Sequence, residues 1–318
     1  MKVLITGAAG NLGSHLAKYL IKENINGLEL RLMIHNKPLS FDITGYKNVE
    51  VCISDLMKPE TLVTTCKDVD CIVHFAGLLF APNPESFLPV TNVVYFKNLV
   101  DTATSLNVKK IILISFPHVE GNTTPENPAE GRLDVAPISV HAQTRLKEEQ
   151  YLFNHCMGKS TIPVSLRVGM IYGKDILMLD AGRYLMKKHL LAVWKKPTWI
   201  HLISLDDFLE STKQAIIKSG VQGIYHIGDE KPLYLQEFLD RMALHLGYSK
   251  PWRLPKLCIK TAAWLVELYA KIFKTRSPLT RDFIEIGMVS YTGDIKRMKE
   301  ELLPQLKYPT IEEGIQIL

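Results

Sequence analysis

A glycine-rich turn near the start of the chain places the strongest constraint on its fold. The apolar run KVLITG (2–7) predicts a strand, and NLGSHLAKYLIKEN (11–24) has the apolar spacing of a helix. Glycines at positions 7, 10 and 13 form the pattern G-x-x-G-x-x-G across the junction. Such glycines permit a tight turn, a close approach of the backbone to a pyrophosphate, and close packing of helix on strand. The first residues therefore predict a strand–turn–helix unit that binds a dinucleotide.

The beginning of that helix is expected to hold the phosphates. Its first N–H groups have no partner within the helix, and the helix dipole favours an anion at this end. The expected contacts are the residues of the loop and of the first helical turn: Gly7, Gly10, Asn11, Leu12 and Gly13.

Short apolar runs alternate with helical patterns as far as residue 174. Further strands are expected at 28–35, 48–55, 70–77, 109–115 and 164–173, and helices at 58–68, 93–107 and 141–157. This alternation predicts an α/β fold with a doubly wound parallel sheet of the Rossmann type. We expect a core at 1–174 and a smaller, mainly helical substrate-binding section at 175–318. The second section is expected to interleave with the core, since WIHLIS (199–204) and GIYHIG (223–228) look like returning strands.

Composition excludes several other classes of protein. The net charge of +5 over 318 residues, without a Lys/Arg block, argues against nucleic-acid binding. The five cysteines show neither a CxxC pair nor a zinc spacing, so we expect reduced thiols, a cytoplasmic protein and no metal. No uniformly apolar window is long enough to span a membrane. The amphipathic stretch 254–274 is expected to be an ordinary packed helix, with a membrane surface or a lipophilic pocket as alternatives.

The ends of the next strands are expected to select the cofactor. An acidic residue after the second strand would bind the ribose hydroxyls of NAD, whereas a basic one accommodates the 2′-phosphate of NADP. The chain has no carboxylate there, so NADP(H) is favoured over NAD(H). The expected contacts at this end are His35, Asn36 and Lys37 after the second strand, Asp55 and Leu56 after the third, and Ala76 and Gly77 after the fourth.

Several motifs together resemble those of the extended short-chain dehydrogenases/reductases. They are TGAAGNLG, SDL, VHFAG, Asn92 in the helix after the fourth strand, LISFPHVEG, HAQTRLKEEQ, LRVGMIYG, IHLISLDDF and the closing GDIKRMKEELLPQLKYPTIEEGI. They run through nearly the whole chain. The resemblance implies the Rossmann fold, an NAD(P) cofactor and a small-molecule substrate. It also implies a possible homodimer in which paired helices form a four-helix bundle. Its chemistry would rest on a Ser/Thr that orients the substrate, a Tyr that acts as general acid/base, and a Lys.

This sequence departs from that pattern at all three positions. Phe116 stands in the Ser/Thr position, His141 in the Tyr position and Arg145 in the Lys position. His141 can exchange a proton near neutral pH, and Arg145 keeps the positive charge and can bind ribose hydroxyls. Ser115 and His118 flank the lost hydroxyl, so either is a candidate partner of His141.

Three functions remain open from the sequence. The first is an NADP-leaning oxidoreductase or epimerase-like enzyme that acts on a small carbonyl or hydroxyl compound through His141 and Arg145. The second is a catalytically silent dinucleotide sensor or scaffold, and the third is a non-redox isomerase or cyclase that uses His141 as a base. An apolar substrate is favoured by the resemblance, while four lysines keep an anionic one open: Lys187, Lys188, Lys195 and Lys196.

Overall fold

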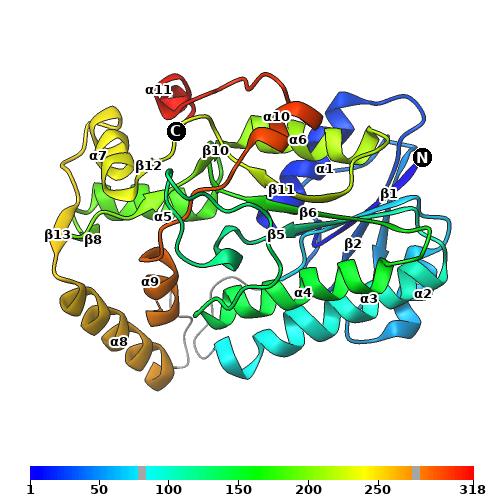
Figure 1. The fold of residues 1–318 in the computed structure, drawn as a ribbon, viewed down its shortest axis with the longest axis horizontal. Helices are drawn as coiled ribbons and strands as arrows, with labels where there is room; N and C mark the ends of the chain where they lie inside the picture. The colour runs from blue at the N-terminus through cyan, green and yellow to red at the C-terminus, as the bar shows by residue number, and fades with distance from the viewer. Residues whose placement is uncertain (78–83, 274–279) are drawn as a thin grey trace.

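A seven-stranded parallel sheet runs through the middle of the computed structural model, which describes residues 1–77, 84–273 and 280–318 (Figure 1). The strand order is β11-β6-β5-β4-β1-β2-β3, and every neighbouring pair is parallel. The strands are β1 (Lys2–Thr6), β2 (Glu29–Ile34), β3 (Val49–Ile53), β4 (Cys71–His74), β5 (Lys110–Ser115), β6 (Ile162–Val168) and β11 (Gly223–Ile227). The doubly wound parallel sheet predicted from the alternating pattern is therefore confirmed.

Helices cover both faces of this sheet. Figure 1 shows α1 (Asn11–Glu23) and α6 (Leu205–Ile217) on one face. The other face carries α2 (Pro59–Cys66), α3 (Tyr95–Ser105) and α4 (Val140–Cys156). A π-helical turn, Pro89–Val94, leads into α3. Alternate residues of β1 enter different cores, since Val3 and Ile5 pack with the α1 side and Leu4 with the α2–α3 side. Burial on both faces explains why the strand sequences are almost continuously apolar.

The second section is mainly helical and carries three two-stranded sheets. Its helices are α5 (Leu177–Lys187), α7 (Leu235–His245), α8 (Lys256–Phe273), α9 (Arg281–Gly287), α10 (Lys296–Glu301) and α11 (Ile311–Gly314). The small sheets pair β7 (Met170–Tyr172) with β10 (Leu202–Ser204), β8 (Ala192–Trp194) with β13 (Trp252–Leu254), and β9 (Trp199–Ile200) with β12 (Leu233–Tyr234). Short 3₁₀ turns occupy Pro84–Ser86, Pro117–Glu120 and Ile315–Ile317. No helix in these described ranges combines the length and apolarity needed to cross a bilayer.

The two segments expected to return to the core behave differently. The segment 223–228 supplies β11, the edge strand beside β6 in the central sheet. The segment 199–204 is divided between β9 and β10, which pair outside that sheet. The boundary proposed at residue 174 stays a prediction.

The single strand expected at 164–173 is wrong, because the chain breaks at Gly169 into β6 and β7. The Gly169 N–H donates to the Ile227 carbonyl at 2.8 Å, and the next residue, Met170, donates to the His201 carbonyl at 2.8 Å. The chain thus leaves the central sheet within one residue. An ideal Cβ at Gly169 would lie 2.4 Å from the His201 carbonyl oxygen, so only glycine fits this crossing.

We predict that Gly169→Ala lowers the free energy of unfolding by about 1–3 kcal/mol, because a carbonyl oxygen occupies the space of the added methyl group. The matched control is Gly182→Ala in α5, where the nearest atom to an added Cβ is Met242 Cε at an ordinary 3.5 Å. That variant is expected to gain about 0.4–1 kcal/mol, since alanine restricts the unfolded chain. Urea unfolding of both variants measures the difference, and equal stabilities would contradict the close approach.

Candidate active site

The glycine turn after β1 has the geometry that a dinucleotide requires. Gly7 has φ +69°, a left-handed conformation that favours glycine. An ideal Cβ at Gly7 would lie 3.0 Å from the Ala76 nitrogen, and one at Gly13 would lie 2.3 Å from the Gly7 oxygen. The Gly10 N–H donates to the Gly7 carbonyl at 2.8 Å, which closes the turn. The backbone surface stays bare because none of these positions carries a side chain.

The start of α1 is open to an anion. Gly10 is the N-cap, no side chain caps the helix, and its first turn has no acidic residue. The Asn11 side chain points elsewhere, because its Nδ2 donates to the Asp175 carbonyl at 2.8 Å and so holds the turn before α5. Leu12 packs against the core. The residues present therefore fit a pyrophosphate held by backbone N–H groups, in the way that the glycine pattern predicts.

The residues after β2 and β3 meet at the expected adenosine end. His35 Nε2 lies 3.8 Å from Asp55 Oδ2, and the His35 side chain is 57% exposed. Asn36 and Lys37 are exposed, and Lys37 makes no hydrogen bond or ion pair within the described residues. Leu56 is buried in the core. The His35 imidazole thus lies beside the Asp55 carboxylate, whereas the sequence predicted separate cofactor contacts for these two residues.

Arg145 reaches from α4 to the end of β4. Its Nη1 donates to Glu148 Oε2 at 2.8 Å, and both side chains are buried. An ideal Cβ at Gly77 would lie 2.4 Å from Arg145 Nη2, so the guanidinium lies directly against that glycine. Burial raises the pKa of Glu148 to about 7, although the charge and hydrogen bond of Arg145 oppose this rise. Arg145 was expected to contact the ribose of the cofactor. In the structure its guanidinium is instead already paired with the buried Glu148 carboxyl group.

The catalytic candidates converge around Phe116. Ser115 ends β5, His118 lies on the following 3₁₀ turn, and His141 lies in the first turn of α4. The Phe116 ring centroid is 4.8 Å from that of His118 and 4.7 Å from that of His141. The aromatic ring thus stands between the two imidazoles. The structure brings together the residues that the sequence singled out, and it places an apolar ring among them.

Several buried polar atoms at this place have no hydrogen-bond partner within the described part of the chain. They are Asn92 Oδ1, Ser115 Oγ, His118 Nδ1 and His141 Nδ1. A buried polar atom without a partner costs about 1–3 kcal/mol and calls for an explanation.

Both histidines are neutral at physiological pH. Burial lowers the pKa of His118 to about 4. Burial, with the nearby charges of Arg145 and His118, lowers the pKa of His141 to about 3. The His118 Nε2 donates to the Val289 carbonyl at 3.1 Å, which leaves Nδ1 as an acceptor. Burial in this structure therefore favours the neutral imidazole of His141, and its catalytic role stays a prediction.

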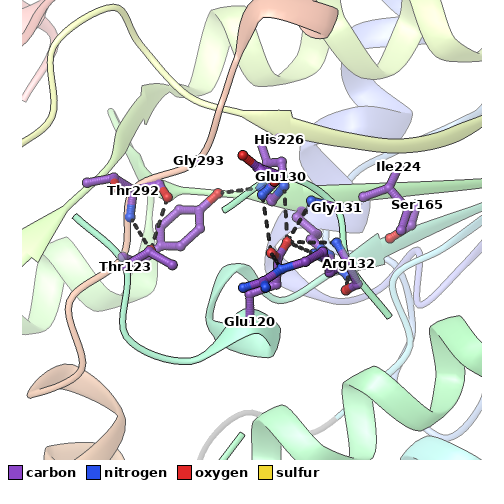
Figure 2. A network of polar contacts seen from close by, with 12 residues as sticks. Glu120, Thr123, Glu130, Gly131, Arg132, Ser165, Ile224, His226, Thr292 and Gly293 are labelled. Carbon is purple, nitrogen blue, oxygen red and sulfur yellow. Dashed lines mark hydrogen bonds and ion pairs between the residues drawn. The ribbon is translucent and has the colours of Figure 1, made fainter. Parts of the chain in front are cut away.

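A buried charge network holds these elements in place (Figure 2). Arg167, fully buried on β6, pairs with Glu120 beside β5 and with Glu149 Oε2 at 2.6 Å on α4. Figure 2 shows Glu120 facing Gly131, Arg132 and His226. Burial alone would raise the pKa of Glu120, but the nearby His226 ring, whose Nε2 lies 3.5 Å from Oε1, the hydrogen bond from the Gly131 N–H and the charge of Arg167 hold it at about 2.

Sequence reasoning missed two contributors to the site, Glu148 and the segment 289–292, and it named Asn92 only as part of the family resemblance. Glu148 lies three residues after Arg145, a helical spacing that could have identified it as a partner. Asn92 is buried and donates through Nδ2 to Thr144 Oγ1 at 3.1 Å on α4. The segment 289–292 supplies the Val289 carbonyl and the Tyr291 ring, whose centroid is 5.6 Å from that of His118. No local signal links this segment to residues that precede it by more than 150 positions.

Comparison with known proteins agrees with this geometry. A model of the NAD dependent epimerase/dehydratase family matches residues 3–193, which is more than half of the chain. The chain belongs to that family. The resemblance drawn from the sequence motifs is thereby confirmed for the fold and the family.

Two curated relatives and one solved structure illustrate what the chain is similar to. Protein CapI of Staphylococcus aureus is 25% identical, with 78% of this chain and 84% of CapI covered. The decarboxylating sterol-4-alpha-carboxylate 3-dehydrogenase of Bos taurus is 23% identical, with 78% of this chain and 70% of the relative covered. The structure of MoeE5 in complex with UDP-glucuronic acid and NAD is similar with a TM-score of 0.74 at 18% identity, covering 100% of this chain and 97% of MoeE5.

We predict that Arg167→Met lowers the free energy of unfolding by about 3–5 kcal/mol, because two buried carboxylates lose their counter-charge. The control is Arg132→Ala, whose guanidinium also contacts Glu120 but is 60% exposed, and which is expected to lose at most about 1 kcal/mol. Denaturant unfolding measures both. The double variant Arg167→Met/Glu149→Leu should recover part of the loss, and a single variant as stable as Arg132→Ala would contradict the network's role.

The buried histidines predict a defined pH dependence of stability. A pKa near 3 for His141 in the folded state means that the unfolded chain binds more protons between about pH 3 and 6.5, so stability falls as pH drops through this window. His141→Phe should flatten the slope by about 1.4 kcal/mol per pH unit. Glu148 acts in the opposite sense, since its raised pKa favours folding at low pH. Glu148→Gln should therefore steepen the slope, and unfolding curves from pH 4.5 to 6.5 test both signs.

Proposed function

We propose that the chain is an NAD(P)-dependent oxidoreductase or epimerase-like enzyme that acts on a small organic carbonyl or hydroxyl compound. The observation that carries this proposal is a group of buried polar atoms without hydrogen-bond partners within the described residues: Ser115 Oγ, His118 Nδ1 and His141 Nδ1. They belong to residues around Phe116, which follows the carboxyl end of β5, and the bare glycine turn follows the carboxyl end of β1. Unpaired donors and acceptors at one place are the expected state of a site that hydrogen-bonds a substrate oxygen.

The residues suggest a division of roles. A bound dinucleotide would supply or accept the hydride, with its pyrophosphate on the glycine turn and the start of α1. Ser115 has a hydroxyl that can donate to a substrate oxygen, and the His118 Nδ1 can accept from a substrate hydroxyl. His141 would orient the substrate as a neutral imidazole. Arg145, lying against Gly77, would contact the cofactor edge while Glu148 holds it in position.

The same geometry favours one of the two alternatives over the other. A silent dinucleotide sensor or scaffold is supported by the low pKa values of both histidines and by the ring of Phe116 among them. These leave no side chain in the cluster that donates a proton readily near neutral pH. A non-redox isomerase or cyclase would need His141 to act as a base, and its pKa near 3 makes it a weak one.

Cofactor and substrate preferences are part of the proposal. NADP(H) is favoured because Lys37 is exposed and unpaired within the described residues, whereas Asp55 beside His35 would oppose a 2′-phosphate. An apolar substrate and a nucleotide sugar both stay open, in line with the names of the sterol dehydrogenase and of MoeE5. Lys187 and Lys188 are exposed on α5, while Lys195 and Lys196 line a surface pocket. A homodimer and a cytoplasmic location stay predictions.

The first experiment is calorimetric titration of the protein with NADPH and with NADH. Binding is expected for the wild type and is expected to be lost in Gly10→Val, because an ideal Cβ at Gly10 already lies 3.0 Å from the Gly7 oxygen. Lys37→Ala should weaken NADPH by roughly three- to tenfold and leave NADH unchanged, since one screened charge contributes about 1 kcal/mol. Failure of the wild type to bind either nucleotide would sink the enzyme and the sensor alike.

Turnover then separates the alternatives. Carbonyl substrates are screened by following NADPH absorbance in the wild type and in His141→Phe, which keeps the shape of a buried ring. Oxidation that requires His141 supports the enzyme. Tight nucleotide binding with no oxidation by any carbonyl favours the sensor, and conversion of a substrate without change in the nucleotide favours the isomerase.

A further inference from the structure

Helix α8 presents an unusually apolar face to solvent. Seven large apolar side chains along it are between 39% and 75% exposed. They are Leu257, Trp264, Leu265, Leu268, Tyr269, Ile272 and Phe273. Contiguous exposed apolar patches of this kind are rare on proteins that act alone in water and mark sites of interaction. We call these seven residues the apolar arc.

The opposite face of α8 holds the helix on the protein through small contacts. Ile259, Ala263 and Ala270 are its buried residues, and they recur at helical spacing. Ile259 and Ala263 pack with Val193, Trp194 and Ile284 in a cluster that is separate from the two main cores. Figure 1 shows α8 at the periphery of the molecule, beside α9. The broader apolar face of the helix thus points away from the body it is attached to.

Charge follows one border of the apolar arc. Successive helical residues are about 100° apart, which places Lys271 and Lys260 next to Trp264 and Lys256 further round, toward the buried face. Lys260 is paired with Glu285 at 2.5 Å. The arc itself, from Trp264 round to Phe273, contains no charged residue. The one carboxylate of the helix, Glu267, is bound by Arg281 at 2.8 Å. The surface therefore combines an uncharged apolar face with a basic edge.

A basic pocket extends this edge beyond the helix. A hollow of about 300 Å³ near the start of α8 is lined by Lys195, Lys196 and Lys256 together with Trp194, Thr198 and Met288. Within the described residues these three lysines, and Lys271 on the helix, form no ion pair. The charges are thus available to an anionic partner.

We propose that α8 docks on the surface of an anionic phospholipid bilayer. The apolar arc would enter the boundary between headgroups and acyl chains, with Trp264 and Tyr269 at the interface that these side chains prefer. The unpaired lysines, which are Lys271 on the border and Lys195, Lys196 and Lys256 at the basic pocket, would contact the lipid phosphates. The helix lies in the plane of the membrane and does not cross it.

Charge complementarity favours this occupant over a second copy of the chain. A two-fold partner packed with its α8 antiparallel would bring its own lysine border close to that of α8, and the arc has no carboxylate to pair with these lysines. An anionic lipid surface matches both the apolar face and the positive edge. The docked helix would also be connected to the candidate site, since α8 packs on α9 and the chain after α9 supplies the Val289 carbonyl that binds His118.

Co-sedimentation with vesicles tests the proposal on the full chain. Phosphatidylcholine vesicles that contain phosphatidylserine should bind the protein, and phosphatidylcholine alone should bind it much more weakly. Binding should weaken with added salt. Leu268→Glu/Ile272→Glu should lower partitioning at least about tenfold, because two inserted side chains become charged. Lys256→Gln and Lys271→Gln should each lower it roughly fivefold.

The control is Leu244→Glu on α7, a leucine that is 79% exposed and lies outside the arc. It should partition like the wild type. Circular dichroism and NADPH titration on each variant separate loss of docking from loss of folding or of nucleotide binding. Wild-type protein that ignores anionic vesicles, or an arc variant that binds them as well as the wild type, overturns the proposal. A third outcome also overturns it: the wild type is a dimer, the arc variant is a monomer, and neither binds vesicles. The arc is then covered by a second copy of the chain.

Discussion

The candidate site depends on one buried guanidinium. Arg167 on β6 binds Glu120 next to β5 and Glu149 on α4, and its Nη2 also donates to the Arg132 carbonyl at 2.8 Å. Glu120 stands two residues after His118, and Glu149 lies on the same helix as His141. Because a charge at this depth is tolerated only when it is paired, the two halves of the site are held in one relative position.

The site has two parts, a glycine turn that keeps the family pattern and a cluster around Phe116 that departs from it. The glycine turn after β1 keeps the bare backbone that a pyrophosphate needs, with no room for a methyl group at Gly13. On the other side, Phe116 stands between two neutral imidazoles, and Arg145 is held by Glu148. Such an arrangement is better suited to forming hydrogen bonds with a polar ligand than to transferring a proton to or from that ligand. Chemistry there would have to come mainly from orientation and from the cofactor.

The fold was largely predictable, and its exceptions have specific causes. The strands of the first half and the helices that follow them lie within a few residues of their predicted positions, since burial on both faces leaves a strong apolar pattern. The break at Gly169 was not predicted, because the atom that forbids a side chain is the carbonyl oxygen of His201, far along the chain. Likewise, nothing near His118 indicates that Val289 and Tyr291 complete its surroundings.

The sequence by itself determined the type of fold, the position of the glycine turn and the identity of the residues around Phe116. Those features rest on local rules, which are the glycine spacing, the alternation of apolar segments and the order of motifs. Only the tertiary structure decided that His118 and His141 are neutral, that Arg145 is held by Glu148, and that the apolar side of α8 faces outward. Protonation, ion pairing and exposure depend on which distant segments exclude water from a side chain, and a linear pattern does not contain that information.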